Sequence, residues 1–198
     1  MERIFFTSKR RNLKIHAQPD DSSCGPTCLH AIYRFYNDAI PLERVIREVK
    51  TLEGGGTLAV FLGCHALKRG YRATIYTLNL QVFDPTWFAK PVEYMVERLK
   101  LRSQSREDSR LSAAVEGYVE FIEKGGEIRF CDMSSRLIRK YLDKNIPVIS
   151  GLSSTFLYRS MREEASSGIE DDVIGDPAGH FVVLVRYDRV KKRILLAD

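Results

Sequence analysis

The sequence has 198 residues and a formal net charge of +5, and 44% of its residues are hydrophobic and 29% charged. These values are typical of a globular protein, and they exclude a low-complexity or disordered chain. No apolar run approaches the ~20 residues that a membrane-spanning helix needs, so no membrane partner is expected.

Cysteine usage and the N-terminus predict the compartment. The four cysteines are Cys24, Cys28, Cys64 and Cys131. A chain of this length buries a core of its own, so their even number does not call for a disulfide framework. The N-terminus lacks the longer apolar stretch of a signal peptide. We therefore expect a single domain over residues 1–198, with reduced thiols, in the cytoplasm.

Charge is distributed unevenly along the chain. Residues 163–176 hold six acidic residues and no basic one, so the rest of the chain carries +11. Basic clusters at residues 9–11 and 191–193 lack interleaved aromatics, so we interpret them as solvated surface and expect no nucleic-acid partner. The acidic segment is interpreted as a solvated loop. The alternative is a lid whose carboxylates favour basic substrate side chains.

Hydrophobic periodicity and turn residues predict the elements in chain order. Short strands are expected at residues 4–6 and 13–15. Helices follow at 24–37, 41–50 and 57–69, the last with Thr57 as its N-cap and Gly70 as its stop. A strand is expected at 71–80.

The second half of the chain continues with helices and ends in strands. Its predicted helices and strands cover residues 85–102 (helix), 111–123 (helix), 127–132 (strand), 134–143 (helix, with a serine cap), 146–151 (strand), 180–187 (strand) and 193–198 (strand). Because helices come first and strands last, we expect an α+β fold with a helical half packed on an antiparallel sheet.

The segment QPDDSSCGPTC at residues 18–28 places a thiol where a polar loop becomes a helix. Unpaired N–H groups and the helix dipole at that end stabilise negative charge, so the position favours the thiolate of Cys24. Gly25 is expected to let the backbone pass close to a substrate, and Pro26 fixes the first turn. The segment therefore predicts a nucleophile.

A thiolate that transfers acyl groups needs an imidazole partner, and the chain has four histidines. His16 is too close to Cys24 in sequence, His30 lies on the same helix facing another way, and His65 is inside a predicted helix. His180 follows Gly179 at the start of the final hairpin, so it is the chosen partner.

Hairpin geometry suggests the group that orients His180. His180 and Asp198 are each nine residues from Arg189. An odd-numbered turn centred there places both side chains opposite each other on one face, whereas a two-residue turn places them on opposite faces. The side-chain amide of Gln18 and the backbone N–H of Cys24 are the expected oxyanion donors.

These residues resemble a known family. The set formed by Gln18, Cys24-Gly25-Pro26-Thr27, Gly179-His180 with its apolar strand, and Asp198 looks like the C39-type, papain-like cysteine peptidases. In that family a Q-x5-C-G-P motif opens a helix, and a later G-H begins a strand that leads through a turn to D-P. The strand IPVISG also resembles the family's strand before the histidine.

The resemblance implies a papain-like fold with Cys24 as nucleophile, His180 as its partner, Asp198 as the orienting acid and Gln18 as oxyanion donor. It implies no cofactor and no metal. Residues 71–135 carry no matching motif. The family's aspartate is normally followed by proline, whereas this sequence ends at Asp198.

We therefore expect a thiol-dependent hydrolase that cleaves a peptide or amide bond in a peptide or protein substrate through an acyl-enzyme. One alternative is a transglutaminase-like acyltransferase, since the same machinery can pass the acyl group to an amine. Another is a catalytically inactive peptide-binding module, which the end at Asp198 favours.

The other cysteines are assigned no chemistry. Cys28 lies one turn beyond Cys24 and is interpreted as a small apolar filler rather than a resolving thiol. Cys64 with His65, and Cys131, have no metal-ligand spacing.

Overall fold

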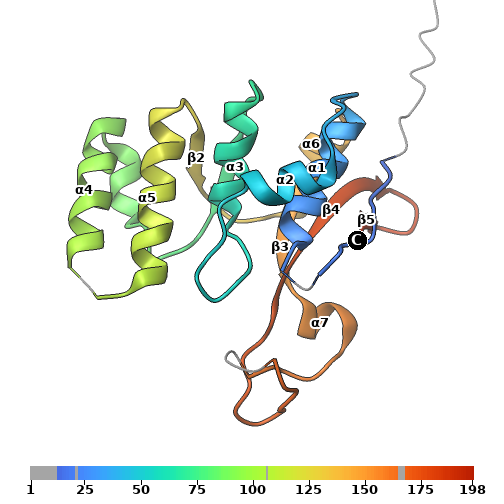
Figure 1. Cartoon of the computed structure of the whole chain (residues 1–198). Helices are drawn as coiled ribbons and strands as arrows, with labels where there is room; N and C mark the ends of the chain where they lie inside the picture. The colour runs from blue at the N-terminus through green and yellow to red at the C-terminus, as the bar shows by residue number, and fades with distance from the viewer. Residues whose placement is uncertain (1–12, 21, 106, 165–167) are drawn as a thin grey trace, which may run out of the picture.

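The computed structural model describes residues 13–20, 22–105, 107–164 and 168–198. Its fold is mixed α+β, as the sequence predicts. The elements in chain order are α1 (Cys24–Phe35), α2 (Leu42–Glu48), α3 (Ala59–Lys68), β1 (Thr74–Thr77), the 3-10 helix η1 (Pro85–Ala89), α4 (Val92–Gln104), α5 (Ser109–Glu123), β2 (Glu127–Phe130), α6 (Ser135–Leu142), β3 (Val148–Ser153), α7 (Ser154–Tyr158), β4 (Gly179–Asp188) and β5 (Arg193–Ala197) (Figure 1).

Two small sheets are present. Strands β3, β4 and β5 form the expected antiparallel sheet, with β4 in the centre. Strands β1 and β2 form a separate parallel pair, in register from Thr74 opposite Glu127 to Thr77 opposite Phe130, which the sequence did not predict. Parallel strands need a long crossover, and η1, α4 and α5 supply it here.

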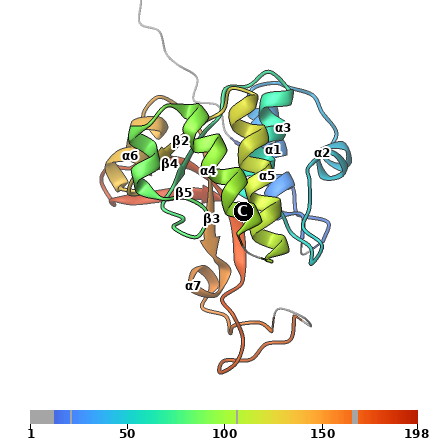
Figure 2. The same ribbon diagram turned by 90° about the vertical axis from the view of Figure 1, so that its left-hand side faces the viewer.

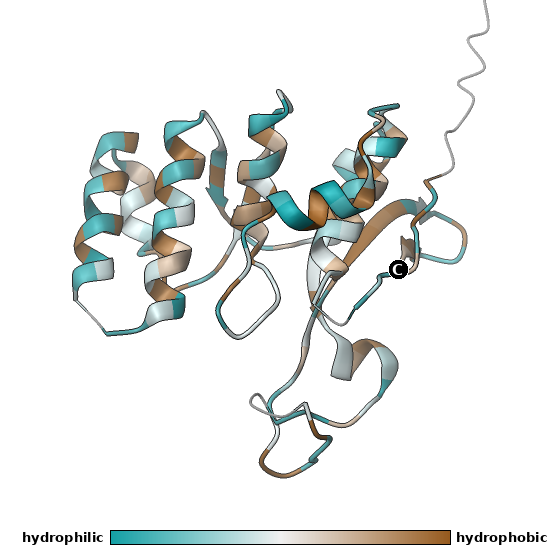
Figure 3. Ribbon diagram, in the orientation of Figure 1, coloured by the Kyte–Doolittle hydropathy of each residue, from teal (hydrophilic) through white to brown (hydrophobic). Residues whose placement is uncertain are grey.

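Strand β4 is buried on both faces. Phe181 packs against the large core built by α1 to α5, whereas Val182 and Leu184 form a smaller core with Leu142 of α6. Side chains alternate between the faces of a strand, so an apolar run such as FVVLV serves two cores at once. Figure 3 shows the middle of β4 as a hydrophobic band beside α1.

Several predicted boundaries need correction. The helix expected at 85–102 is broken at Pro91, because a proline disfavours helical backbone at the residue before it, and Lys90 is extended (φ −111°, ψ 165°). No strand forms at residues 13–15, and residues 4–6 lie outside the described part of the chain. Helix α7 was not predicted.

The predicted caps have mixed outcomes. Thr57 does not cap α3, which begins at Ala59; its hydroxyl donates to the Lys50 carbonyl at 2.8 Å instead. Gly70 follows α3 with φ +81°, as expected for a glycine stop. Ser134 caps α6 and accepts a hydrogen bond from the Leu137 N–H at 3.2 Å, which confirms the predicted serine cap. Over the described ranges, no helix is both long and apolar enough to cross a membrane.

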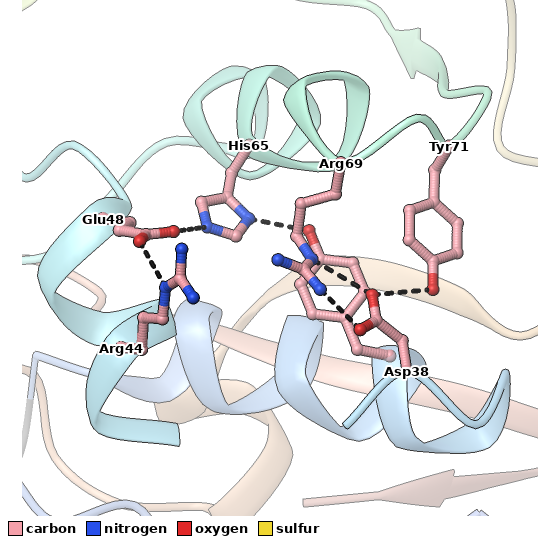
Figure 4. Close-up of polar contacts among 7 residues, drawn as sticks. Asp38, Arg44, Glu48, His65, Arg69 and Tyr71 are labelled. Atoms are coloured by element: carbon pink, nitrogen blue, oxygen red, sulfur yellow. Dashed lines mark hydrogen bonds and ion pairs between the residues drawn. The ribbon is translucent and has the colours of Figure 1, made fainter. Parts of the chain in front are cut away.

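A polar network holds α1 against α2 and α3. It consists of two hydrogen-bonded groups, Tyr33–His65–Glu48–Arg44 and Arg69–Asp38–Tyr71 (Figure 4). The groups meet where the Arg69 guanidinium lies over the Tyr33 ring, 5.2 Å from its centroid. Arg69 binds Asp38 through two nitrogens, with distances of 3.0 Å and 2.5 Å. Because Asp38 follows the end of α1, this bidentate pair fixes that end against α3.

His65 lies in the middle of this network and is buried. Its Nδ1 lies 2.7 Å from the Tyr33 hydroxyl and its Nε2 lies 3.2 Å from a Glu48 oxygen. Burial lowers the pKa of His65, which favours the neutral ring. In that form Nδ1 accepts from Tyr33 and Nε2–H donates to Glu48, so His65 has a structural role that suits its place inside a helix.

Candidate active site

The structure brings the four predicted site residues to one cleft of about 710 Å³. Gln18 and Cys24 come from the start of the described chain, and His180 and Asp198 from its end. The wall between them is formed by α7 and by Glu163 and Gly168 of the following loop. Helix α1 packs against β4, so the start of α1 and the strand that carries His180 lie side by side (Figure 1).

Cys24 is the first residue of α1, half-buried, and its thiol is free. No side chain caps the helix, and Pro26 has no N–H. The turn before the helix is held instead by Asp20, whose Oδ1 accepts from Ser22 and whose carbonyl accepts from the Ser23 hydroxyl. The N-terminal field of α1 is thus available to the sulfur.

Gly25 packs against protein rather than lining the cleft, which corrects its expected role beside a substrate. It is buried, and a Cβ on it would lie 2.6 Å from Thr57 Cγ2 and 3.2 Å from Phe181 Cδ2. Only glycine therefore lets the start of α1 approach both the segment before α3 and strand β4. That approach brings Cys24 near the strand that carries His180.

His180 and Asp198 form a hydrogen-bonded pair, with Nε2 and Oδ1 2.5 Å apart. The turn that joins their strands is not odd-numbered, because Asp188 pairs with Arg193 and four residues lie between them. This even turn alone would put the two side chains on opposite faces.

A β-bulge in β4 reverses that outcome. The register shifts between Leu184 and Arg186, so that Val183 rather than Leu184 lies opposite Ala197. The one extra residue in β4 moves Asp198 to the face of His180, at a diagonal rather than a directly opposite position. The predicted pairing is present, but through a bulge that the sequence analysis did not anticipate.

Burial affects both members of the pair. It lowers the pKa of His180 and raises the pKa of Asp198, because each charged form loses hydration in the cleft. The bond to Asp198 occupies Nε2, so Nδ1 is the ring nitrogen that Asp198 does not engage. The Tyr158 ring packs against the imidazole edge to face, with centroids 5.9 Å apart.

Cys28 is a buried thiol that is tied to the sheet. Its Sγ donates to the Phe181 carbonyl at 3.2 Å, and burial raises its pKa to about 12. Cys28 therefore stays protonated near neutral pH and links α1 to β4, which fits its interpretation as a filler.

The remaining two histidines meet in a second cavity of about 420 Å³, together with Arg34 and Glu43. The rings of His16 and His30 have centroids 5.4 Å apart, and His16 Nε2 contacts Arg34 Nη1. His16 also lines the larger cleft, on the same segment as Gln18. His30 lines the second cavity and is not among the described residues that line the larger cleft, as its place on the helix suggested.

Cys24 and Gln18 lie in the cleft without fixed partners. Neither side chain forms a hydrogen bond to another described residue. Catalytic hydrogen bonds are often long in an enzyme without substrate and tighten when substrate binds. The arrangement is thus a thiol and a His–Asp pair that share one cleft. Among the residues that the structure describes, no group of histidine, cysteine or acidic side chains is arranged to hold a metal.

Comparison with known proteins gives no match. Protein-family models, curated proteins and solved structures were all compared with the chain, and none matches it. Function must therefore be argued from the residues of the cleft.

Three residues of the cleft, Thr27, Tyr158 and Glu163, have no individual role predicted from the sequence; Thr27 appears there only within the Cys-Gly-Pro-Thr motif and Glu163 only within the acidic segment. Thr27 is buried with an unpartnered hydroxyl, and its position three residues after Cys24, on the same side of a helix, was the available signal. Tyr158 and Glu163 reach the cleft only because α7 and its loop fold back beside His180. No local pattern in the sequence indicates that return.

Proposed function

We propose that the protein is a thiol-dependent hydrolase that cleaves a peptide or amide bond through a covalent acyl-enzyme. One observation carries the proposal: Cys24, at an uncapped helix start, lines the same cleft as a hydrogen-bonded His180–Asp198 pair. Helix starts favour the thiolate, and a paired imidazole is the group that a thiol nucleophile requires.

The residues have distinct roles in this reaction. The Cys24 thiolate attacks the carbonyl carbon, and the C=O π electrons move to oxygen, where the Cys24 N–H and the Gln18 amide donate to it. As the tetrahedral adduct collapses, the C–N bond breaks and His180 gives its proton to the leaving amine. Water then attacks the thioester with His180 as base, which releases the acid and restores the thiol.

Asp198 acts through His180. Its bond to Nε2 sets the ring orientation and leaves Nδ1 as the nitrogen to which the proposal assigns proton exchange with the Cys24 thiol. A helix that begins with the thiol and packs on an antiparallel sheet bearing the histidine is the arrangement of the papain-like fold, and we assign the chain to that fold as part of the same proposal.

Cysteine alkylation tests the nucleophile. Iodoacetamide at pH 6.5, followed by peptide mass spectrometry, should modify Cys24 at least about tenfold faster than the exposed Cys131. The buried Cys28 and Cys64 serve as unreactive controls, since burial raises the pKa of both. Slower modification of Cys24 than of Cys131 would contradict a thiolate nucleophile.

Cleavage itself is tested on a proteome-derived peptide mixture. The wild-type protein should generate new peptide ends, Cys24→Ala should generate none, and Cys131→Ala should match the wild type. Equal cleavage by Cys24→Ala would assign the products to a contaminant. Binding of peptides without any cleavage would identify a peptide-binding module instead.

A further inference from the structure

We infer that Glu163 selects substrates with a lysine or arginine close to the bond that is cleaved. The inference rests on the proposed hydrolase function, because it assigns a specificity residue to the same cleft. Glu163 lines the cleft together with Cys24 and His180, although it lies 139 residues after Cys24 and 17 before His180 in the chain.

The cleft is acidic in a chain of net positive charge. The described residues that line it include Glu163 and Asp198, and none of them is lysine or arginine. Asp198 is already engaged by His180. Glu163 forms no ion pair with any described residue, so its carboxylate is the acidic group left for a ligand.

The backbone at Glu163 is held in a defined position. Its N–H donates to the Asp176 carbonyl at 3.0 Å, and the Asp176 N–H donates back at 2.9 Å. The adjoining Gly175 is buried, and a Cβ there would lie 2.4 Å from the Asp171 carbonyl oxygen and 2.9 Å from the Glu163 nitrogen. The close approach requires glycine at this position, which indicates a built structure around Glu163.

The surrounding segment offers apolar contact as well as charge. Residues 154–164 and 168–178, called here the projecting segment, extend away from both the helices and the sheet in two perpendicular views (Figures 1 and 2). Phe156, Val173 and Ile174 on it are each more than 70% exposed. Figure 3 shows hydrophobic and hydrophilic residues alternating along the segment.

The segment's two basic residues do not neutralise the site. The Arg159 guanidinium lies over the Phe156 ring, 4.9 Å from its centroid, and Arg162 does not line the cleft. An extended polypeptide that carries lysine or arginine among apolar residues therefore matches both features: its cation meets Glu163, and its apolar side chains cover the exposed ones.

The test measures binding and cleavage separately. Binding of positional-scanning peptide libraries is measured with Cys24→Ala. Cleavage of the same libraries is measured in parallel with the protein that retains Cys24. Each measurement is repeated with Glu163→Gln, Glu163→Lys and, as a matched control, Asp172→Asn. Asp172 is an exposed acid on the same segment that does not line the cleft.

We expect peptides with lysine or arginine to be preferred by about fivefold at one position. Glu163→Gln should remove the preference, Glu163→Lys should reverse it toward acidic residues, and Asp172→Asn should leave it intact. Raising the salt concentration should weaken the basic preference of the wild type and of Asp172→Asn, and the acidic preference of Glu163→Lys.

The outcomes separate the inference from the proposed function. Cleavage without a basic preference, or a preference that survives in Glu163→Gln, would overturn the inference and leave the hydrolase intact. Basic peptides bound by Cys24→Ala in a Glu163-dependent way, with no cleavage by the wild type, would overturn the hydrolase and support the role of Glu163. Equal binding of acidic and basic peptides would overturn the inference whatever the activity.

Discussion

At the scale of single residues, the His180–Asp198 pair is the most informative feature of the cleft. Its short hydrogen bond gives the imidazole a defined ring orientation, and partial burial of both groups makes that bond stronger than it would be in water. In the proposed hydrolase, Asp198 is therefore a positioning residue whose contribution to catalysis depends on an acceptor oxygen and on its charge. The two contributions can be separated by substitution.

Asp198→Ala removes the acceptor and the charge, whereas Asp198→Asn keeps an oxygen that accepts Nε2–H. We expect kcat to fall by about 100-fold in Asp198→Ala and by a smaller factor in Asp198→Asn. Because a carboxylate beside the ring stabilises imidazolium, the limb of the pH–rate profile that reports His180 should move to lower pH in both variants. Identical kcat values for the two variants, with an unmoved limb, would contradict a positioning role.

At the scale of elements, the contact between α1 and β4 decides whether the thiol and the imidazole share a cleft. Gly25 is the point of closest approach, and Cys28 adds a hydrogen bond from α1 to the backbone of β4 one turn later. The close packing at Gly25 therefore predicts how substitutions there change the stability of the fold.

Gly25→Ala should lower the free energy of unfolding by about 1–3 kcal/mol, because its Cβ overlaps Thr57 Cγ2. Thr57→Ser removes that methyl group and keeps the hydroxyl that bonds Lys50, so the double variant should recover most of the loss. Gly54→Ala is the matched control, since a Cβ there meets nothing within 4 Å. Urea unfolding measures the free energy of unfolding of the wild type, Gly25→Ala, Gly54→Ala and the double variant. If the double variant is no more stable than Gly25→Ala, the overlap with Thr57 is not the cause.

At the scale of the whole molecule, two buried histidines, His30 and His65, and the partly buried His180 link folding to pH. Burial lowers the pKa of His30, His65 and His180 below the ordinary value of about 6.5. The unfolded chain therefore binds more protons than the folded one as pH falls. Their contribution to stability is fully present above about pH 6.5 and is lost progressively below it.

We therefore expect the free energy of unfolding to decrease between pH 7.5 and pH 5.5, a window above the ordinary carboxyl range. Urea titrations across this window measure the slope. His65→Gln keeps a polar side chain in the network but cannot titrate, so it should be less stable at pH 7.5 and show a shallower slope. A slope as steep as that of the wild type would exclude His65 from the effect.

Much of the secondary structure was predictable because its signals are local. The loop-to-helix change at Cys24, the serine cap of α6 and the glycine after α3 each depend on neighbouring residues and appear as predicted. The break before α4 also has a local signal, which is Pro91 itself. It was missed because the apolar periodicity continues across the proline.

Non-local pairing was not predictable in this way. Strands β1 and β2 pair although Thr74 and its partner Glu127 are 53 residues apart in the sequence. Neither strand has a sequence pattern that indicates which strand it pairs with. Short strands gain their pairing from the helices packed around them, here α3 and α5. Helix α7 likewise is a single short turn that depends on Ser153 and on its contacts with β3 and β4.

The sequence by itself determined which residue types were available for chemistry: one thiol at a helix start, a glutamine before it, and a histidine and an aspartate at either end of a final hairpin. Only the tertiary structure decided that they meet. An even turn alone separates His180 from Asp198, and the bulge between Leu184 and Arg186 rejoins them in a strand that buries Phe181 and Val183 on one face and Val182 and Leu184 on the other. Burial on both faces is a property of the folded whole, and no local stretch of the chain contains it.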